Sequence, residues 1–338
     1  MKHIFKPIFT SKNILINCSF LLLILTFFYF PSLTQAASLG LGIYPPVISI
    51  QAKPPVHIST PLTIINETNN SITAQISYKL FTAGSNQNGE LTFLPEKNLP
   101  YPDQLLFKKV KIYENNNAIN TITLDPNQQK KLNLDITLPK NEALGDYYFS
   151  IIFASTSTAT IDKTSLGAIG GIGTNVLLSI GPKGKAQGRI QQFSTPQFIN
   201  SGPVPFILLV NNTGSHIINP QGFITITNMF NQTIGKVTLL PVNILEHSVR
   251  AIPDSTNSQE VPVANPFLPD IPIAVWPEHF LLGPYTATVQ LSLSENGPII
   301  KNTTHFFAFP IIFLIFIFFV IIISVIIFLR VKSHINRG

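Results

Sequence analysis

Strict alternation of apolar and polar side chains most constrains the fold of this 338-residue chain. In the stretches 72–80, 131–138 and 285–294, every second residue is apolar and those between are polar. Neighbouring side chains of a strand point to opposite faces, so each stretch predicts a strand with one buried face. Clusters rich in Asn or Gly, such as 66–70 and 211–214, predict turns between strands. Together they favour an all-β fold of short antiparallel strands, as in a β-sandwich.

A weak internal repeat suggests two such sandwiches. The segment 61–68 is echoed by 205–213, where an apolar strand runs into an Asn-rich turn. The segment 144–149 is echoed by 282–287, where a glycine precedes a tyrosine-led strand. We therefore predict two tandem Ig-like β-sandwich domains followed by one C-terminal transmembrane α-helix. The expected division is a signal peptide at 1–36, a first sandwich at 37–182, a linker at 183–188, a second sandwich at 189–305, a transmembrane helix at 306–329 and a basic tail at 330–338.

The charge distribution supports this division. All sixteen acidic residues lie between Ala37 and His305, together with sixteen of the basic ones. The whole excess of +6 lies in Lys2, Lys6 and Lys12 at one end and in Arg330, Lys332 and Arg337 at the other. Lys and Arg flanking apolar runs set membrane orientation. The basic pI near 9.3 therefore indicates topology, and we expect no nucleic-acid partner.

The N-terminal apolar run 20–30 follows a basic region and precedes small residues at Thr34 and Ala36. This pattern predicts a signal peptide cleaved before Ala37. The only cysteine, Cys18, precedes the apolar core, so we expect no lipid attachment and a mature chain without cysteine.

The C-terminal run 306–329 carries no charged residue and no polar side chain except Ser324. About 20 apolar residues suffice to cross a bilayer. We expect a single-pass protein of the cell membrane, with an extracytoplasmic ectodomain and a cytoplasmic C-terminus.

Four short motifs stand within this layout: 42–50 (GIYPPVISI), 88–93 (NGELTF), the glycine-rich 167–173 and 281–285 (LLGPY). With these motifs, the chain resembles the WxL-interacting proteins of bacterial cell surfaces. The resemblance implies two Ig-like domains, the first associated with WxL proteins and peptidoglycan and the second with host surfaces. The partner is then another surface protein of WxL type or a wall polymer such as peptidoglycan.

Catalytic and metal-binding patterns are weak. The glycines of 167–173 lack the Lys and Ser or Thr of a phosphate loop, so a hairpin or bulge is expected there. The exported histidines form no i, i+2 or i, i+4 pair, and we expect no metal site and no cofactor. They are His57, His216, His247, His279 and His305. Asp125, Asp135, Asp146 and Asp162 could include a catalytic acid pair, but no nucleophile context is visible.

Three other groups of residues have both a binding and a structural interpretation. Lysines at 108, 109, 111, 130, 131, 183 and 185 could meet an anionic polymer, or could protect strand edges from aggregation. Asn66, Asn211, Asn231 and Asn302 open N-x-T triplets, which are acceptors for glycosylation. The cluster 147–149 (YYF) could form a binding surface or belong to the core.

The sequence thus predicts a non-catalytic binding or scaffold protein of the cell surface. Two alternatives remain open. An extracytoplasmic assembly chaperone would need an exposed edge strand at a cleft between its domains. A sandwich-fold hydrolase would need acidic or histidine groups that converge in a pocket.

Overall fold

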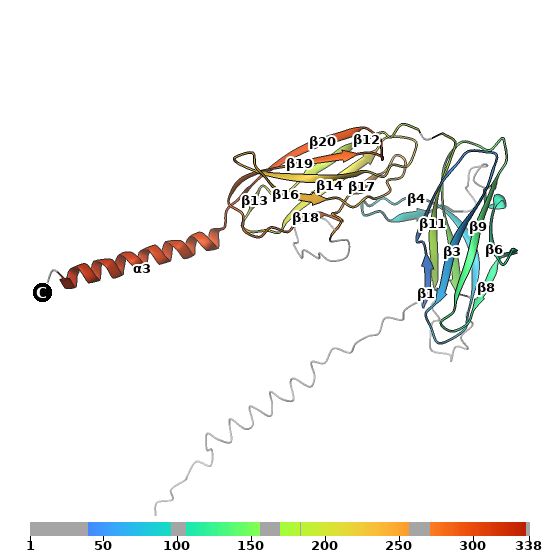
Figure 1. The fold of residues 1–338 in the computed structure, drawn as a ribbon, viewed down its shortest axis with the longest axis horizontal. Helices are drawn as coiled ribbons and strands as arrows, with labels where there is room; N and C mark the ends of the chain where they lie inside the picture. Colours follow the sequence, from blue (N-terminus) through green and yellow to red (C-terminus); the bar gives the residue numbers. More distant parts are fainter. Residues whose placement is uncertain (1–39, 96–105, 156–169, 183, 257–270, 336–338) are drawn as a thin grey trace, which may run out of the picture. The chain divides into compact units, whose positions relative to one another are not determined.

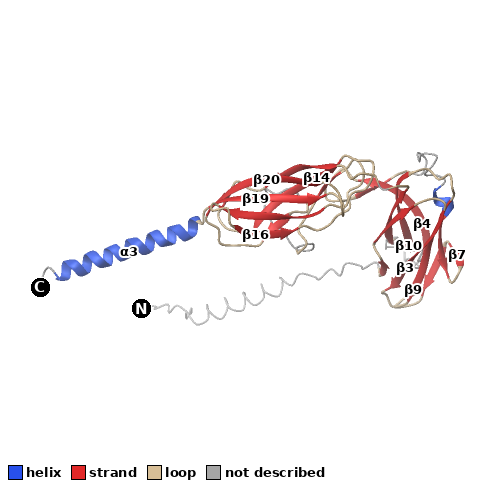
Figure 2. Ribbon diagram, turned by 45° about the horizontal axis from the view of Figure 1, so that its top comes forward, coloured by secondary structure: helices blue, strands red, loops and turns tan. Residues whose placement is uncertain are grey.

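The computed structural model describes residues 40–95, 106–155, 170–182, 184–256 and 271–335. The predicted signal peptide, with Cys18 and the cleavage site before Ala37, lies outside these residues. Strands dominate the described chain, and the long helix α3 follows them at the C-terminal end (Figures 1 and 2). The described residues from Leu41 onward group as one compact unit.

The first sandwich consists of two sheets. One sheet has the strand order β1-β3-β9-β6-β7, and the other has the order β2-β11-β10-β4-β5 with β8 paired to β4. The strands are β1 (Leu41–Tyr44), β2 (Val47–Ala52), β3 (Val56–Asn66), β4 (Ile72–Ala83), β5 (Leu91–Phe93), β6 (Val110–Glu114), β7 (Asn117–Ile119), β8 (Thr121–Leu124), β9 (Gln129–Leu138), β10 (Gly145–Ser155) and β11 (Gly171–Ile180). A short 3-10 helix, η2 (Phe107–Lys109), precedes β6.

Alternation places one face of each sheet in the first core. In β9, Leu132, Leu134, Ile136 and Leu138 are buried and the residues between them are more accessible. The facing sheet supplies apolar side chains from β4, β10 and β11 to the same cluster, among them the fully buried Phe149. Because both sheets bury their apolar side chains together, the predicted sandwich packing is confirmed for this half of the chain.

The second sandwich repeats the plan. One sheet has the order β12-β14-β17, with β18 also paired to β14, and the other has the order β13-β20-β19-β15-β16. The strands are β12 (Gly188–Ser194), β13 (Phe198–Ile199), β14 (Val204–Asn212), β15 (Gln221–Asn228), β16 (Thr233–Thr238), β17 (Val249–Ala251), β18 (Ala274–Trp276), β19 (Gly283–Ser292) and β20 (Ile299–Ala308). Tyr285, Ala287, Val289 and Leu291 of β19 are buried in a second core, as their alternation predicts.

In both sandwiches the first strand crosses from one sheet to the other. β1 pairs antiparallel with β3, and β2, two residues further on, pairs parallel with β11. Likewise β12 pairs antiparallel with β14, and β13 pairs parallel with β20. Prolines stand at both crossings, Pro45-Pro46 and Pro196, where the missing N–H breaks the strand. The prediction of antiparallel strands alone was therefore incomplete.

The repeat seen in the sequence corresponds to two equivalent buried asparagines. Asn66 ends β3 and Asn212 ends β14, and neither is exposed. The Nδ2 of Asn66 donates to the carbonyls of Asn70, Leu124 and Asp125, and the Nδ2 of Asn212 donates to those of His216, Ile244 and Leu245. Each Oδ1 accepts the N–H two residues further on. In each sandwich, one buried asparagine thus connects a turn to a segment distant in sequence through hydrogen bonds.

The C-terminal end differs from the prediction in its bounds. Strand β20 continues to Ala308, because Phe306 and Ala308 are buried in the second core opposite Tyr285 and Gly283. The second sandwich therefore extends beyond 305, and the helix, α3 (Ile311–Ile335), begins after 306. Within the described residues, no helix was found that is long and apolar enough to cross a membrane. The predicted span at 306–329 is thus not confirmed.

A polar cavity as the candidate binding site

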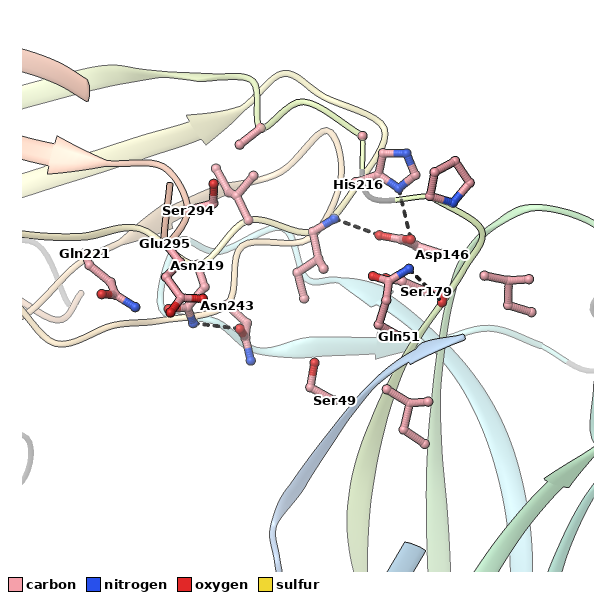
Figure 3. Close-up of a pocket in the computed structure, with 17 residues that line it drawn as sticks. Ser49, Gln51, Asp146, Ser179, His216, Asn219, Gln221, Asn243, Ser294 and Glu295 are labelled. Atoms are coloured by element: carbon pink, nitrogen blue, oxygen red, sulfur yellow. Dashed lines mark hydrogen bonds and ion pairs between the residues drawn. The ribbon is translucent and has the colours of Figure 1, made fainter. Parts of the chain in front are cut away.

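Polar side chains gather around a cavity of about 400 Å³. They come from β2, from the ends of β10 and β11, and from loops of the second sandwich. Figure 3 shows Gln51, Asp146, Ser179 and His216 on one side, with amide side chains across from them. The polar residues of the lining are Ser49, Gln51, Asp146, Ser179, His216, Asn219, Gln221, Asn243, Ser294 and Glu295.

Asp146 organises one side of the cavity. Its side chain is fully buried, and its Oδ1 lies 3.1 Å from Nδ1 of His216. Its Oδ2 accepts hydrogen bonds from the Ile217 N–H at 2.8 Å and from the Tyr148 hydroxyl at 3.2 Å. A buried carboxylate is tolerated where charge or hydrogen bonds compensate for lost water. These bonds also orient the His216 ring, which remains partly exposed at the cavity.

Local sequence explains how these two side chains reach the site. Asp146 is the second residue of β10 and follows Gly145, whose φ of +146° favours glycine. His216 lies in the loop after β14, and its carbonyl accepts a hydrogen bond from the buried Asn212. The Asn-rich turn of the repeat therefore fixes the segment that carries His216.

Burial and the Asp146 carboxylate shape the electrostatics nearby. Burial raises the pKa of Tyr148, and the adjacent Asp146 raises it further. The phenol therefore remains a hydrogen-bond donor throughout the physiological range. The pKa of Glu246 is also raised, first by partial desolvation and then by Asp146, while His247 and His216 lower it. Although Glu246 is largely exposed, its position beside Asp146 makes its charge unfavourable.

Amides and hydroxyls line the rest of the cavity. Asn219 donates from its Nδ2 to Oδ1 of Asn243 at 2.8 Å. Gln51 donates to the carbonyl of Gly181 at 2.6 Å. Ser49 and Ser294 add hydroxyls, which both donate and accept. An array of this kind can bind a ligand rich in hydroxyl and amide groups.

A small apolar cluster supports the site from behind. Phe81, Tyr148 and Leu177 of the first sandwich pack with Leu245 of the second. The rings of Phe81 and Tyr148 stack at 6.1 Å. Since Tyr148 also donates to Asp146, this packing helps to hold the carboxylate in place.

The structure brings together two of the predicted candidates, Asp146 and His216, and leaves Asp125 and Asp135 apart from them. Asp135 accepts a hydrogen bond from Ser59 and lies 3.4 Å from His57, at the surface of the β3–β9 pair. Asp125 lies at the β8–β9 turn, and Asp162 lies outside the described residues. No group of three or more His, Cys, Asp or Glu side chains suited to a metal ion occurs in the described part of the chain.

Other predicted groups have structural roles. Glu142 and Glu114 pair with Lys109 and Lys130, which reduces the local excess of positive charge. Lys108, Lys111, Lys131 and Lys185 are exposed, and Lys183 is outside the description. The buried Asn66 uses its Nδ2 in three hydrogen bonds and is not an accessible glycosylation acceptor. Asn231 and Asn302 are exposed, and Asn211 is half-buried.

Two other sequence features lie within strands. Tyr147, Tyr148 and Phe149 are all buried, so this cluster is core and not a surface. Of the glycine-rich segment, Gly171 and Gly173 lie in β11, in regular register with β10, and not in a hairpin or bulge. A Cβ on Gly173 would come within 3.0 Å of the Ile151 carbonyl oxygen, so close packing explains this glycine. Residues 167–169 are outside the described part.

The fold so described is that of a chain with two β-sandwiches, each with its own core. Residues 49–155 match the family model described as "WxL Interacting Protein, peptidoglycan binding domain". The match runs from β2 to the end of β10 and confirms the resemblance to WxL-interacting proteins. No curated protein matches the chain in sequence.

Solved structures similar to this chain include fimbrial chaperones. The class 5 fimbriae chaperone CfaA is 10% identical, with a TM-score of 0.35, covering 78% of this chain and 98% of its own. The E. coli chaperone DraB is 12% identical, with a TM-score of 0.32, and the match covers 78% of this chain and 97% of DraB. A Salmonella enterica complex of the SafA pilin with the SafB chaperone gives 12% identity and a TM-score of 0.32, covering 80% and 99%.

Proposed function

We propose that this chain is a non-catalytic binding protein of the bacterial cell surface that holds peptidoglycan in its polar cavity. The observation that carries the proposal is the ring of amides and hydroxyls around a cavity beside the matched residues 49–155. Peptidoglycan offers sugar hydroxyls, N-acetyl groups and peptide amides. These match the donors and acceptors of Asn219, Gln221 and Asn243 better than an ionic polymer would.

The proposal includes a membrane anchor within α3, at 311–329, with the C-terminus in the cytoplasm. It is supported by an uncharged sequence from Ile311 to Leu329 and by the basic residues Arg330, Lys332 and Arg337 beyond it. A surface protein of WxL type is proposed as a further partner on the family match alone. The assembly-chaperone and hydrolase alternatives remain hypotheses.

The test is co-sedimentation of the detergent-solubilised full chain with purified insoluble peptidoglycan. We expect saturable binding, and Asn219→Ala is expected to weaken it several-fold because it removes an amide from the cavity wall. The matched control is Asn133→Ala, an exposed asparagine on the outer face of β9. It should bind as the parent does.

Three outcomes would contradict the proposal. Equal binding by both variants and the parent would exclude the cavity as the site. Loss of all binding at moderate salt would indicate the exposed lysines and an anionic polymer, since charge contacts are screened by salt. Release of soluble wall fragments by the pure protein would show catalysis.

A further inference from the structure

Exposed apolar side chains gather at one end of the second sandwich. Outside α3, thirteen large apolar residues of the described chain are strongly exposed, and six of them lie at this end. We call them the aromatic patch: Phe198, Met229, Phe230, Leu282, Phe307 and Phe309. Phe198 and Phe230 are 79% and 74% exposed. An apolar cluster of this kind commonly marks a contact with a protein or a membrane.

Strand register and ring contacts join three of the six patch residues, Phe198, Phe307 and Phe309. Phe198 of β13 pairs with Phe307 of β20, and their rings lie 6.4 Å apart. Phe307 stacks on Phe309 at 6.2 Å. Met229 and Phe307 line the same shallow pocket. Gly283, with a φ of +96°, leaves room for the end of Met229, which a Cβ would meet at 2.6 Å.

The patch lies at the end of the sandwich from which the chain leaves. The last residues of β20 pair with the first residues of β19, and the last residue of β15 pairs with Tyr285. Only Phe309 and Pro310 separate β20 from α3. The three residue steps from Ala308 to Ile311 span at most about 11 Å. The first turn of α3 therefore begins close to the patch, in whichever direction the helix points.

We propose that the aromatic patch contacts the lipid bilayer surface next to the membrane anchor. This inference rests on the anchor suggested under the proposed function. A bilayer is the favoured occupant, because the patch continues in sequence into nineteen residues without a charge, from Ile311 to Leu329. Among the residues that line the pocket beside it, His305 is the only titratable side chain apart from the phenol of Tyr285. The pocket beside the patch therefore carries little charge, and anionic lipid is not required for the contact.

The test uses the full chain in phosphatidylcholine nanodiscs. In a Cys18→Ser background, Phe230→Cys carries an environment-sensitive dye, and a fraction of the lipid carries a shallow nitroxide quencher. The matched control is Ile299→Cys, which is 59% exposed at the opposite end of β20. The two sites lie about 30 Å apart along the strands. We expect several-fold stronger quenching at 230 than at 299, and Leu282→Cys should behave as 230 does.

Other results overturn the proposal. Equal quenching at 230 and 299 in chains that remain in the discs would refute the patch contact and leave the anchor intact. Chains that separate from the discs on gel filtration would refute the anchor and, with it, the contact. Energy transfer between differently labelled copies at 230, without lipid quenching, would assign the patch to a second copy of the chain.

Discussion

The buried side chains of Asn66 and Asn212 carry more structural information than their neighbours in the same turns. Each amide donates to three carbonyls, and these carbonyls belong to segments far apart in sequence. A buried acceptor left without a partner costs about 1–3 kcal/mol. Asparagine is required here because neither aspartate nor a hydroxyl offers two donors together with an acceptor.

Asn212→Ala is expected to destabilise the second sandwich by about 3 kcal/mol or more, because it removes two N–H donors, which serve three carbonyls, and one acceptor at a buried position. The midpoint of unfolding can be followed through Trp276, the only tryptophan, which is buried in the second core. Asn302→Ala, at an exposed position of β20, is the control and should change the stability little. A small effect from Asn212→Ala would show that the turn holds without its side chain.

At the scale of single strands, alternation determines which residues are buried. Tyr285→Ala is expected to cost about 3 kcal/mol or more, because the ring stacks on Phe306 at 5.2 Å within the second core. Thr286→Ala should cost less than about 1 kcal/mol, since Thr286 lies on the other face of β19. Denaturant titration followed by Trp276 fluorescence compares the two. Equal costs would contradict the assignment of faces.

The sequence predicted those features of the strands that depend on local pattern alone. The alternation of 72–80, 131–138 and 285–294 identified buried residues because period two is a property of the strand itself. The crossing of the first strand was not predictable, since parallel pairing of β2 with β11 joins residues more than a hundred positions apart. The bounds of β20 were missed for a related reason. Phe306 and Ala308 are as apolar as the run that follows, and only tertiary packing assigns them to a sheet.

At the scale of the whole molecule, the cavity depends on contacts that no local pattern reveals. Asp146 and His216 were both noted in the sequence, but nothing linked them across seventy residues. The amides of Asn219 and Asn243 gave no signal at all in a chain rich in asparagine. Residues that bind neutral ligands through hydrogen bonds follow no fixed spacing, and their convergence is a result of the fold.

The carboxylates of Asp146 and Glu246 predict that the stability of the fold depends on pH. A raised pKa means that ionised Glu246 opposes folding at neutral pH, and that this cost is absent below the ordinary pKa of glutamate, near 4.5. Glu246→Gln is therefore expected to raise the melting temperature slightly at pH 7. The gain should vanish as the pH falls toward 4, where both states of the parent are protonated. A gain that is equal at both pH values would exclude the electrostatic cause.

The crossing of the first strand also affects how the second sandwich responds to mechanical load. β13 and β20 run parallel, and the Phe307 and Phe309 N–H groups donate to the carbonyls of Gln197 and Ile199 at 2.8 and 2.9 Å. In the arrangement proposed above, in which the wall holds the first sandwich and the membrane holds the C-terminal end, tension pulls these two strands in opposite directions along a shared axis. Their hydrogen bonds are then sheared together instead of opening in succession. Survival under force depends on the rate of unfolding, so this pairing favours a tether that stays folded while the envelope stretches.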